Sequence, residues 1–189
     1  MNNILSCLEG AKTVMIAGHT RPDGDCVGAC MGLWHYIRDN YPYIQADVRL
    51  EPVPDSYKVI AGVEQIISDY EDDRTYDLFI ALDASDKERL AGAKKYFDTA
   101  EHTICIDHHI SNPGYADENL IAAGCQLYLR SADRADGIWT AISYDAAVAL
   151  YIGIICDTGV FKYSCTSHRY HGYGRLPDGK RHSVFGPDR

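Results

Sequence analysis

Four apolar segments along the chain each end abruptly at residues that carry carboxylate or imidazole groups. Apolar runs of this length are typical of buried strands, and parallel strands end together at one edge of an open α/β sheet. Residues that are distant in the sequence can therefore meet there. The four polar ends are the loop at residues 18–25, Asp83, the triplet Asp107-His108-His109, and Asp157. The pattern predicts a metal site assembled from several segments.

The same pattern predicts alternating strands and helices. Strands are expected at residues 13–17, 46–50, 77–82, 103–106 and 160–163, where apolar residues run together or alternate. Helices are expected at residues 25–39 and 145–155, with shorter helical pieces or turns at 3–10, 64–70 and 89–97. Asp25 is expected to be the N-cap of the first long helix. The alternation predicts an α/β fold with a mainly parallel sheet flanked by helices, as in Rossmann-like domains.

Within the first long helix, apolar residues recur at helical spacing and include Trp34. We therefore interpret Trp34 as a core residue rather than a platform for a ligand. Small residues at positions 28, 29 and 32 would let this helix pack closely on the sheet. The acidic cluster at residues 71–73 is interpreted as a solvated loop, and residues 112–114 as a turn.

Composition and charge narrow the class of protein. The 189 residues suffice for one domain, or for one domain and part of another. The formal net charge of −9 argues against an electrostatic grip on long nucleic acid. The seven cysteines lack paired metal-ligand spacing, which favours reduced, mostly buried thiols over disulfides. No apolar run reaches the roughly 20 residues of a membrane span, and residues 1–10 do not resemble a signal peptide. We expect a cytoplasmic protein without a membrane partner.

The candidate ligands fit a pair of divalent cations. His19, Asp23 and Asp25 lie within seven residues, and Gly24 lets the backbone turn sharply between the two aspartates. Asp83, His108 and Asp157 complete a set of four aspartates and two histidines. Such oxygen and imidazole ligands favour Mn²⁺, with Mg²⁺, Co²⁺ or Fe²⁺ as alternatives, and the lack of thiolates disfavours structural zinc. Six ligands with one shared carboxylate suit two ions about 3.5–4 Å apart, as used in phosphoryl hydrolysis. Single turn or cap residues would explain one such site more readily than four together.

These four blocks resemble the motifs of the DHH phosphoesterase family, which is named for its Asp-His-His triplet. The resemblance runs from about residue 4 to 121 and from about 145 to 167, so that residues 1–167 are interpreted as a DHH catalytic domain. The matching blocks are Gly18-His19-Thr20-Arg21-Pro22-Asp23-Gly24-Asp25, Asp83 in Ala81-Leu82-Asp83, Asp107-His108-His109, and Asp157 in Ile155-Cys156-Asp157-Thr158-Gly159.

The resemblance also implies a role for each residue of the motifs. One Mn²⁺ would be held by His19, Asp23 and Asp83. The second would be held by Asp25, Asp83, His108 and Asp157, with Asp83 as the bridge. His109 would stabilise charge beside the scissile phosphate, and Asp107 would orient the histidine pair.

The sequences of the first and fourth motifs are most similar to those of the bacterial branch of nano-RNases (oligoribonucleases) and pAp phosphatases. This branch implies hydrolysis of very short oligonucleotides, dinucleotides or pAp, and the acidic chain suits short substrates. A pyrophosphatase of the same family, or a truncated fragment that binds nucleotide or metal without turnover, are the alternatives. A homodimer is left open.

Two segments depart from the family pattern. Family members continue into a second domain, DHHA1, which would bind the substrate and is not recognisable here. Residues 168–189 are rich in Gly, His, Arg and Pro, and residues 122–144 are atypical, since the sequence at 130–136 suits a helix poorly. Read one base later with permissible codons, both segments can encode amphipathic helices. We therefore hypothesise one compensated frameshift between about 121 and 145 and another near 167, which resequencing the gene would test. The alternative for the tail is plain disorder.

Overall fold

In the computed structural model, which describes residues 7–121 and 142–163, the described strands form a single parallel sheet. Its order is β2-β1-β3-β4-β5, and every pairing is parallel. The strands are β1 (Thr13–Ala17), β2 (Gln45–Arg49), β3 (Leu78–Leu82), β4 (His102–Asp107) and β5 (Glu118–Ile121). The predicted α/β fold with a parallel sheet is confirmed. The edge strand β5 escaped prediction because its four residues, Glu-Asn-Leu-Ile, give too short an alternation.

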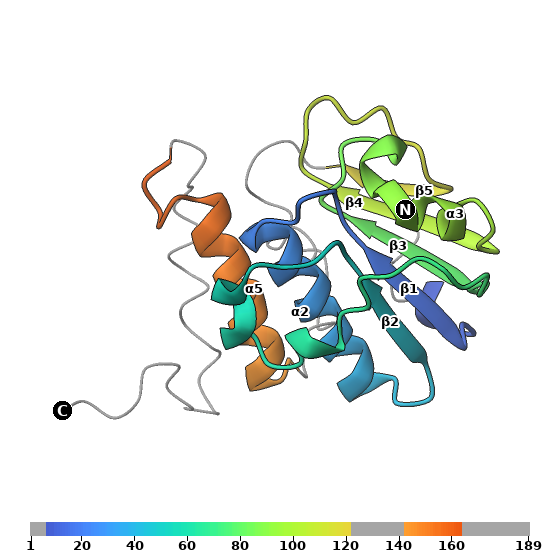
Figure 1. Ribbon diagram of the computed structural model, residues 1–189, viewed down its shortest axis with the longest axis horizontal. Coiled ribbons are helices and arrows are strands. Elements are labelled where there is room, and N and C mark those ends of the chain that lie inside the picture. The colour runs from blue at the N-terminus through green and yellow to red at the C-terminus, as the bar shows by residue number, and fades with distance from the viewer. Residues whose placement is uncertain (1–6, 122–141, 164–189) are drawn as a thin grey trace.

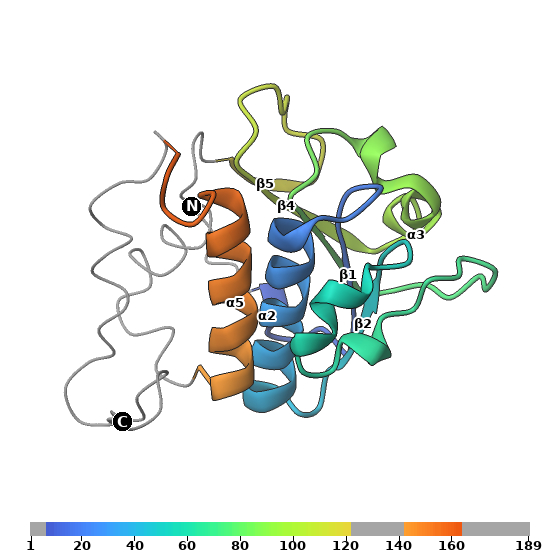
Figure 2. The ribbon, with the colours of Figure 1, turned by 60° about the vertical axis from the view of Figure 1, so that its left-hand side comes forward.

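Helices cover both faces of this sheet. Figure 1 and Figure 2 show α2 packed on one face with α5 beside it, while α3 lies on the opposite side. The helical elements are α2 (Gly24–Asn40), η1 (Asp55–Val59), η2 (Val63–Gln65), η3 (Lys87–Ala93), α3 (Lys94–Phe97) and α5 (Tyr144–Asp157). The predictions for the two long helices and for the partly helical piece at 89–97 are therefore confirmed.

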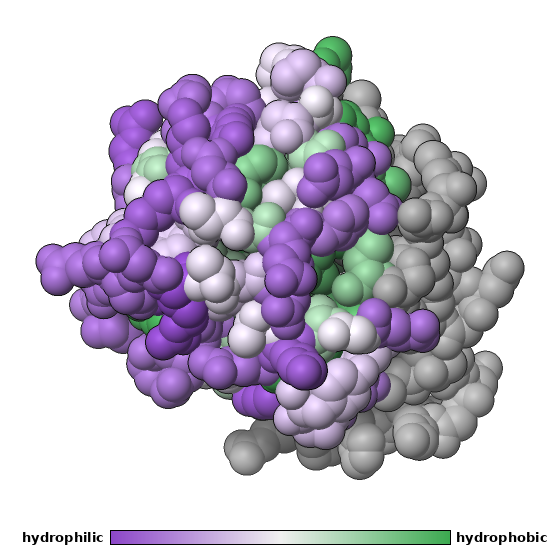
Figure 3. All heavy atoms as spheres, turned by 90° about the vertical axis from the view of Figure 1, so that its right-hand side faces the viewer, coloured by the Kyte–Doolittle hydropathy of each residue, from purple (hydrophilic) through white to green (hydrophobic). Residues whose placement is uncertain are grey.

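The sheet separates two apolar cores. Successive strand residues point to opposite faces, so Ile16 and Ile80 pack towards α2, whereas Met15 and Phe79 pack towards α3. Because both faces are covered, all residues of β3 are buried, which explains its continuous apolar sequence. Away from these cores the surface is polar, and the side of the molecule in Figure 3 is mostly hydrophilic with small apolar areas between charged side chains.

The small residues of α2 serve a different contact from the one expected. A Cβ atom at Gly28 would lie 2.6 Å from the carbonyl oxygen of Ala149, and one at Gly32 would lie 2.5 Å from Leu150 Cδ2. Both glycines therefore let α5, rather than the sheet, approach α2. Trp34 packs against the core and its Nε1 donates a hydrogen bond to Ala46 O at 3.0 Å, which confirms its interpretation as a core residue.

Two local predictions were wrong, and the short helix or turn expected at 64–70 is only partly present. Residues 160–163 form turns instead of a strand, because Val160 and Phe161 have φ values of 59° and 61° in the left-handed region. The N-cap of α2 is Asp23, whose side chain accepts from the backbone N–H groups of Asp25 and Cys26. The region 64–70 contains only the end of η2, and its residue 67 forms a bridge to Arg49. Asp157 ends α5, as the helix predicted at 145–155 implied.

Several predictions concern residues that the structure does not describe. The hypothesised frameshifts affect mainly residues 122–141 and 164–189, which lie outside the described ranges, as do residues 3–6 of the helix expected at 3–10. Of the cysteines that are described, none forms a disulfide, and Cys26, Cys30 and Cys105 are buried. Among the described residues, no helix is both long and apolar enough to cross a membrane.

Candidate metal centre

The carboxyl edge of the sheet carries all eight residues that were predicted for the site. The seven that line a cavity of about 410 Å³ are His19, Asp23, Asp25, Asp83, His108, His109 and Asp157. The eighth, Asp107, ends β4 and is fully buried beside them. The first loop follows β1, and Asp83 follows the neighbouring parallel strand β3. From β1 the chain continues to β2 on one side, whereas β3, β4 and β5 lie on the other side, so the strand order reverses between β1 and β3. The cavity therefore lies at the switch point of the sheet, where ligands of α/β proteins bind.

Asp83 lies between two imidazoles. Its Oδ2 is 3.4 Å from His19 Nε2, and its Oδ1 is 3.1 Å from His108 Nε2. Oδ1 is buried and, despite this approach, makes no hydrogen bond of good geometry in the described structure. A φ of 54° holds Asp83 in the left-handed region, which is strained for a residue other than glycine. The Asp83 carboxylate thus presents one oxygen to His19 and the other to His108.

The first half of the centre surrounds His19. Its Nε2 lies 3.6 Å from Asp23 Oδ1, and its Nδ1 lies 2.7 Å from the carbonyl oxygen of Thr20. The Thr20 contact places a proton on Nδ1 and leaves Nε2 to face the carboxylates. Burial alone would lower the pKa of His19, but Asp23 and Asp83 outweigh it and raise the pKa to about 11. Hydrogen bonding to His19 lowers the pKa of Asp23 to about 2, against the effect of burial.

The second half surrounds His108. Its Nε2 lies 3.7 Å from Asp25 Oδ2, and its Nδ1 lies 4.0 Å from Asp157 Oδ1. The neighbouring Asp83 carboxylate raises the pKa of His108 to about 9, although burial opposes the shift. Burial raises the pKa of Asp157 above the usual range of a carboxyl group. Asp157 reaches the site from the last residue of α5, so the packing of α5 on α2 decides its position.

His109 and Asp107 form a hydrogen-bonded pair at the edge of the cavity. His109 Nδ1 lies 2.7 Å from Asp107 Oδ1. The second oxygen of Asp107 accepts a hydrogen bond from Asn112 Nδ2 at 2.7 Å. Asn112 is buried and also donates to the carbonyl oxygen of Ala84. Asp107 is therefore fixed on both sides and holds the ring of His109.

The donor set fits divalent cations. Asp83 Oδ1 is a buried anionic atom without a hydrogen bond among the described residues, and the carboxylates of the cluster favour positive charge, since they raise the pKa of both His19 and His108. Donors that share one ion with bond lengths of about 2.1 Å are about 3 Å apart, near the separations around Asp83. Oxygen and imidazole donors suit Mn²⁺, Mg²⁺ or Co²⁺. Cys26, which approaches His19 and Asp83, has a pKa raised by its hydrogen bond to Cys30 and by burial, which favours a neutral thiol.

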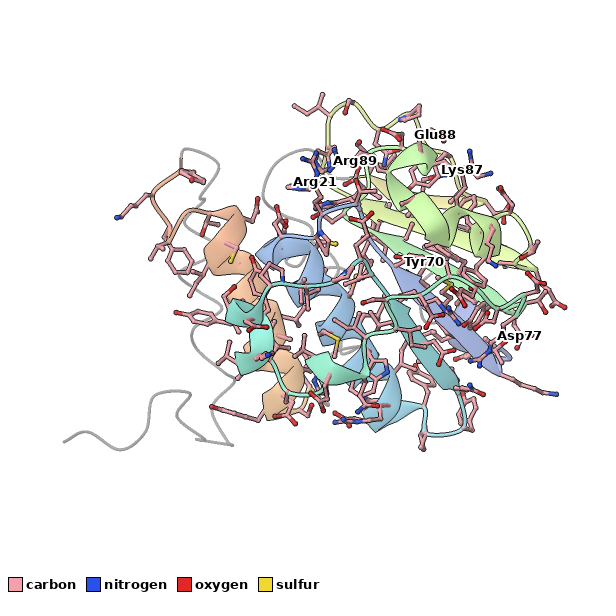
Figure 4. All side chains as sticks on the ribbon, viewed as in Figure 1. Arg21, Tyr70, Asp77, Lys87, Glu88 and Arg89 are labelled. Carbon is pink, nitrogen blue, oxygen red and sulfur yellow. The ribbon has the colours of Figure 1, made fainter. Side chains whose placement is uncertain are left out.

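Arg89 is a cavity residue that the sequence did not single out. It lies in η3, and its backbone carbonyl accepts a hydrogen bond from the Thr20 N–H at 2.8 Å. Its Nε is buried and has no hydrogen-bond partner among the described residues. Figure 4 shows Arg89 next to Arg21, above the carboxyl end of β1. Nothing in the spacing of this polar segment signals the position, because η3 turns at Ala91, whose φ is 48°.

The fold and the site together define the class: an α/β domain whose parallel sheet carries an aspartate- and histidine-lined cavity at its switch point. Residues 13–154 match the DHH family, N-terminal domain. The chain therefore belongs to the DHH family, as its motifs indicated.

Two curated relatives match most of this chain in sequence. The bifunctional oligoribonuclease and PAP phosphatase NrnA of Mycoplasma pneumoniae is 32% identical over 176 residues, covering 87% of this chain and 52% of that protein. The protein of the same name from Bacillus subtilis is 26% identical over 167 residues, covering 83% and 50%. The chain thus spans about half the length of these relatives. A solved exopolyphosphatase-related protein from Bacteroides fragilis has a TM-score of 0.76 at 22% identity, covering 89% of this chain and 53% of that one, and this likeness shows the fold.

Proposed function

We propose that this chain is a metal-dependent phosphoesterase domain that hydrolyses short oligonucleotides, dinucleotides or pAp. The observation that carries the proposal is the position of Asp83, which offers one oxygen to the His19 half of the centre and the other to the His108 half. A carboxylate placed in this way suits a bridge between two ions.

The two halves differ in their ligands. His19, Asp23 and Asp83 would hold one Mn²⁺, and a second set would hold the other, with Mg²⁺ or Co²⁺ as alternatives. The second set consists of Asp25, Asp83, His108 and Asp157. Bound ions of this kind lower the pKa of water and neutralise charge on a phosphoryl group. The aspartates position the ions, and the Thr20 carbonyl keeps the His19 ring in the orientation that ligation requires.

His109 is proposed as a catalytic residue. Its Nδ1 is engaged by Asp107, which leaves Nε2 to donate a hydrogen bond to a phosphate oxygen. Asp107 is buried and orients this imidazole through that contact. The side chain of His109 is 39% exposed, more than that of any other predicted site histidine, so a substrate can reach it.

The preference for small substrates has three supports. The net charge of −9 disfavours long nucleic acid. A cavity of about 410 Å³ has the size of a small-molecule site. The relatives from Mycoplasma pneumoniae and Bacillus subtilis are named oligoribonuclease and PAP phosphatase, which act on short nucleotides.

The test is Mn²⁺-dependent hydrolysis of a di-adenylate, of pAp and of pyrophosphate by the chain and by its Asp83→Asn variant. We expect the wild-type chain to cleave the di-adenylate or pAp, and Asp83→Asn to lose at least about 100-fold in rate together with Mn²⁺ affinity. Release of orthophosphate from pyrophosphate alone would favour the pyrophosphatase alternative. A chain that binds Mn²⁺ but cleaves none of the three would overturn the proposal in favour of binding without turnover.

Arg89 is expected to contact a substrate phosphate, because it lines the cavity and its Nε has no hydrogen-bond partner in the described part of the chain. Arg89→Ala should raise the KM for pAp about 10-fold or more, the usual effect of losing a charge-assisted hydrogen bond, while Mn²⁺ affinity stays unchanged. Steady-state kinetics and calorimetric Mn²⁺ titration measure the two quantities. Arg38→Ala is the control, since Arg38 pairs with Asp39 in the last turn of α2. An equal effect in both variants would contradict the assignment.

A further inference from the structure

A second group of metal-ligating side chains lies at the amino edge of the sheet. Cys7 precedes β1, His102 begins β4, and Glu118 begins β5. Cys7 Sγ and His102 Nε2 each lie 3.3 Å from the same oxygen, Glu118 Oε1. The metal centre with Asp83 is at the carboxyl edge, so the whole length of the strands separates the two groups. Figure 4 shows this separation through Arg89 at one edge and Asp77, which precedes β3, at the other.

The strand register explains why these residues meet. Ile104 pairs with Glu118, and His102 stands two residues before Ile104 on the same face of β4. Cys7 packs against the core on that face. Three segments that are far apart in the sequence therefore converge at one point.

The imidazole of His102 is further oriented by a second carboxylate. Its Nδ1 lies 3.6 Å from Asp117 Oδ2. That oxygen is itself fixed, because it accepts hydrogen bonds from the backbone N–H and the hydroxyl of Thr103 at 2.9 and 2.8 Å. Pairing of one imidazole nitrogen with a carboxylate is the usual support for a histidine whose other nitrogen binds a metal.

An ion can reach the cluster from solvent. Cys7 and His102 line a cavity of about 330 Å³, whose wall also contains Asp77, Glu101 and the cationic Lys12. Cys7, His102 and Glu118 are each half-buried. An ion could therefore reach these three side chains from solvent, and they would partly shield it from water once it is bound.

We propose that Cys7, His102 and Glu118 bind Zn²⁺ through sulfur, nitrogen and oxygen, with water in the fourth position. With zinc bond lengths of about 2.3 Å to sulfur and about 2.1 Å to nitrogen and oxygen, tetrahedral ligand atoms are about 3.4–3.6 Å apart. The observed separations of 3.3 Å need little adjustment to match. A thiolate with an imidazole selects Zn²⁺ over Mn²⁺, so the two edges of the sheet hold different metals. The single cysteine explains why cysteine spacing gave no sign of this site.

Zinc at this position would connect the segment before β1 to the edge strand β5. Zn²⁺ that binds the folded state alone stabilises the fold, and the effect grows with the zinc concentration relative to its Kd. The site lies outside the proposed phosphoesterase centre, and its function would be structural.

Cobalt reports directly on thiolate ligation. Titration of the full chain with Co²⁺ should produce a sulfur-to-cobalt charge-transfer band in the near ultraviolet, and Cys7→Ser should abolish it. Cys156→Ser is the matched control, because Cys156 lines the aspartate–histidine cavity. Asp83→Asn is a second control, because it disables the aspartate–histidine centre and leaves Cys7 in place. Both controls should keep the band, and circular dichroism should show that all variants are folded.

Thermal unfolding with Zn²⁺ gives a second readout. Zn²⁺ should raise the Tm of the wild type and of Asp83→Asn, but not of Cys7→Ser, and His102→Gln should lose most of the shift. Absence of the band from the wild type, its persistence in Cys7→Ser, or an equal Zn²⁺ shift in all variants would overturn the proposal and leave the cluster as a hydrogen-bonded group.

Discussion

Asn112 acts on His109 through Asp107, although it does not line the cavity. A carboxylate with one oxygen on an imidazole and the other on a fixed amide can neither rotate nor choose another partner. Asn112 supplies that amide and is itself fixed by Ala84 O and by the Gly114 N–H, which donates to its Oδ1 at 2.8 Å. The direction of the His109 ring thus depends on a residue in the turn that follows the Asp-His-His triplet.

Replacing Asn112 by alanine should lower kcat about 10- to 100-fold, because Asp107 loses one of the two contacts that orient it. Mn²⁺ affinity should stay within about twofold, since no proposed ligand is touched. Steady-state kinetics with pAp measure kcat, and a Mn²⁺ titration measures the affinity for the ion. If the effect passes through Asp107, the kcat of the double variant Asn112→Ala/Asp107→Asn should be little lower than that of Asp107→Asn alone.

The matched control is Asn40→Ala, at the end of α2, where Asn40 donates to Tyr36 O. A similar loss of kcat in that variant, or fully additive losses in the double variant, would mean that Asn112 affects stability alone.

Arg49 shows how a charged side chain is kept in the interior. Its side chain is 1% exposed and lies 4.6 Å above the Tyr96 ring, while its guanidinium contacts Asp72 and donates to the carbonyl oxygen of Asp69 at 2.8 Å. The pKa of Asp72 is lowered to about 2, chiefly by its hydrogen bond with Arg49. The predicted solvated loop at 71–73 is therefore partly wrong, because one member anchors the loop to β2.

This pair makes stability pH-dependent. Because the folded pKa of Asp72 lies below the unfolded value of about 3.9, its contribution is complete above about pH 5 and is lost as the pH falls towards 2. Asp72→Asn should lower the free energy of unfolding at pH 7 by about 1 kcal/mol, less than for a fully buried pair because Asp72 is partly exposed. Urea unfolding between pH 3 and 7 should show a smaller dependence on pH in the variant. Asp73→Asn should leave the wild-type curve unchanged, since the Asp73 side chain is fully exposed.

Single residues were predictable where their chemistry is rare in combination. Aspartate and histidine at the ends of apolar runs indicated all eight site residues, and the structure brings them together. Arg89 and Asn112 could not be predicted, because arginine in a polar segment and asparagine in a turn are ordinary in any sequence. Their positions near the site come from the turn of η3 and from the buried carboxylate of Asp107, which only the folded chain defines.

At the level of elements, the contact between α2 and α5 positions Asp157. A Cβ atom at Gly28 would also lie 2.7 Å from the backbone nitrogen of Gly153, so glycine on both helices brings the two backbones close together. Asp157 follows one turn after Gly153. Any outward shift of α5 would therefore move this carboxylate away from His108.

Gly28→Ala should destabilise the fold by about 1–2 kcal/mol through overpacking, even though alanine has the higher helix propensity. It should also weaken Mn²⁺ binding, because α5 must shift. Urea unfolding and Mn²⁺ titration are the measurements. Arg38→Ala, at a half-exposed position of the same helix, should have little effect on either. A stabilised Gly28→Ala variant with normal Mn²⁺ affinity would show that the helices adjust without moving the site.

Elements were predictable in proportion to their length and periodicity. The long helices and the continuous apolar strands agree with the structure to within a few residues. Short elements were less so: β5 is four residues long, and the apolar residues 160–161 suggested a strand although they turn in the left-handed region. Such local geometry follows from the helix end and its hydrogen bonds, such as that from the Phe161 N–H to Thr158 Oγ1, rather than from hydrophobic pattern.

At the scale of the molecule, the proposed ligands join segments from residue 19 to residue 157. Ions bound by these residues should stabilise the segments that carry the ligands and so protect their amides from exchange. Mn²⁺ should slow amide hydrogen exchange at the end of α5, and EDTA should reverse the effect. Mass spectrometry of the exchanged chain measures this, with Asp157→Asn as the comparison. Equal protection in the wild type and in Asp157→Asn would show that α5 does not respond to Mn²⁺ bound at the centre.

The origin of Asp157 on a helix has a kinetic consequence. Asp23, Asp83 and His108 are carried by loops that leave the sheet, whereas Asp157 is held by α5 packing against α2. Loosening of α5 would remove one ligand from the His108 half and leave the His19 half intact. The two ions would then exchange at different rates, with the His108 ion leaving first. The chain would pass through a state with one ion whose lifetime is set by a helix–helix contact.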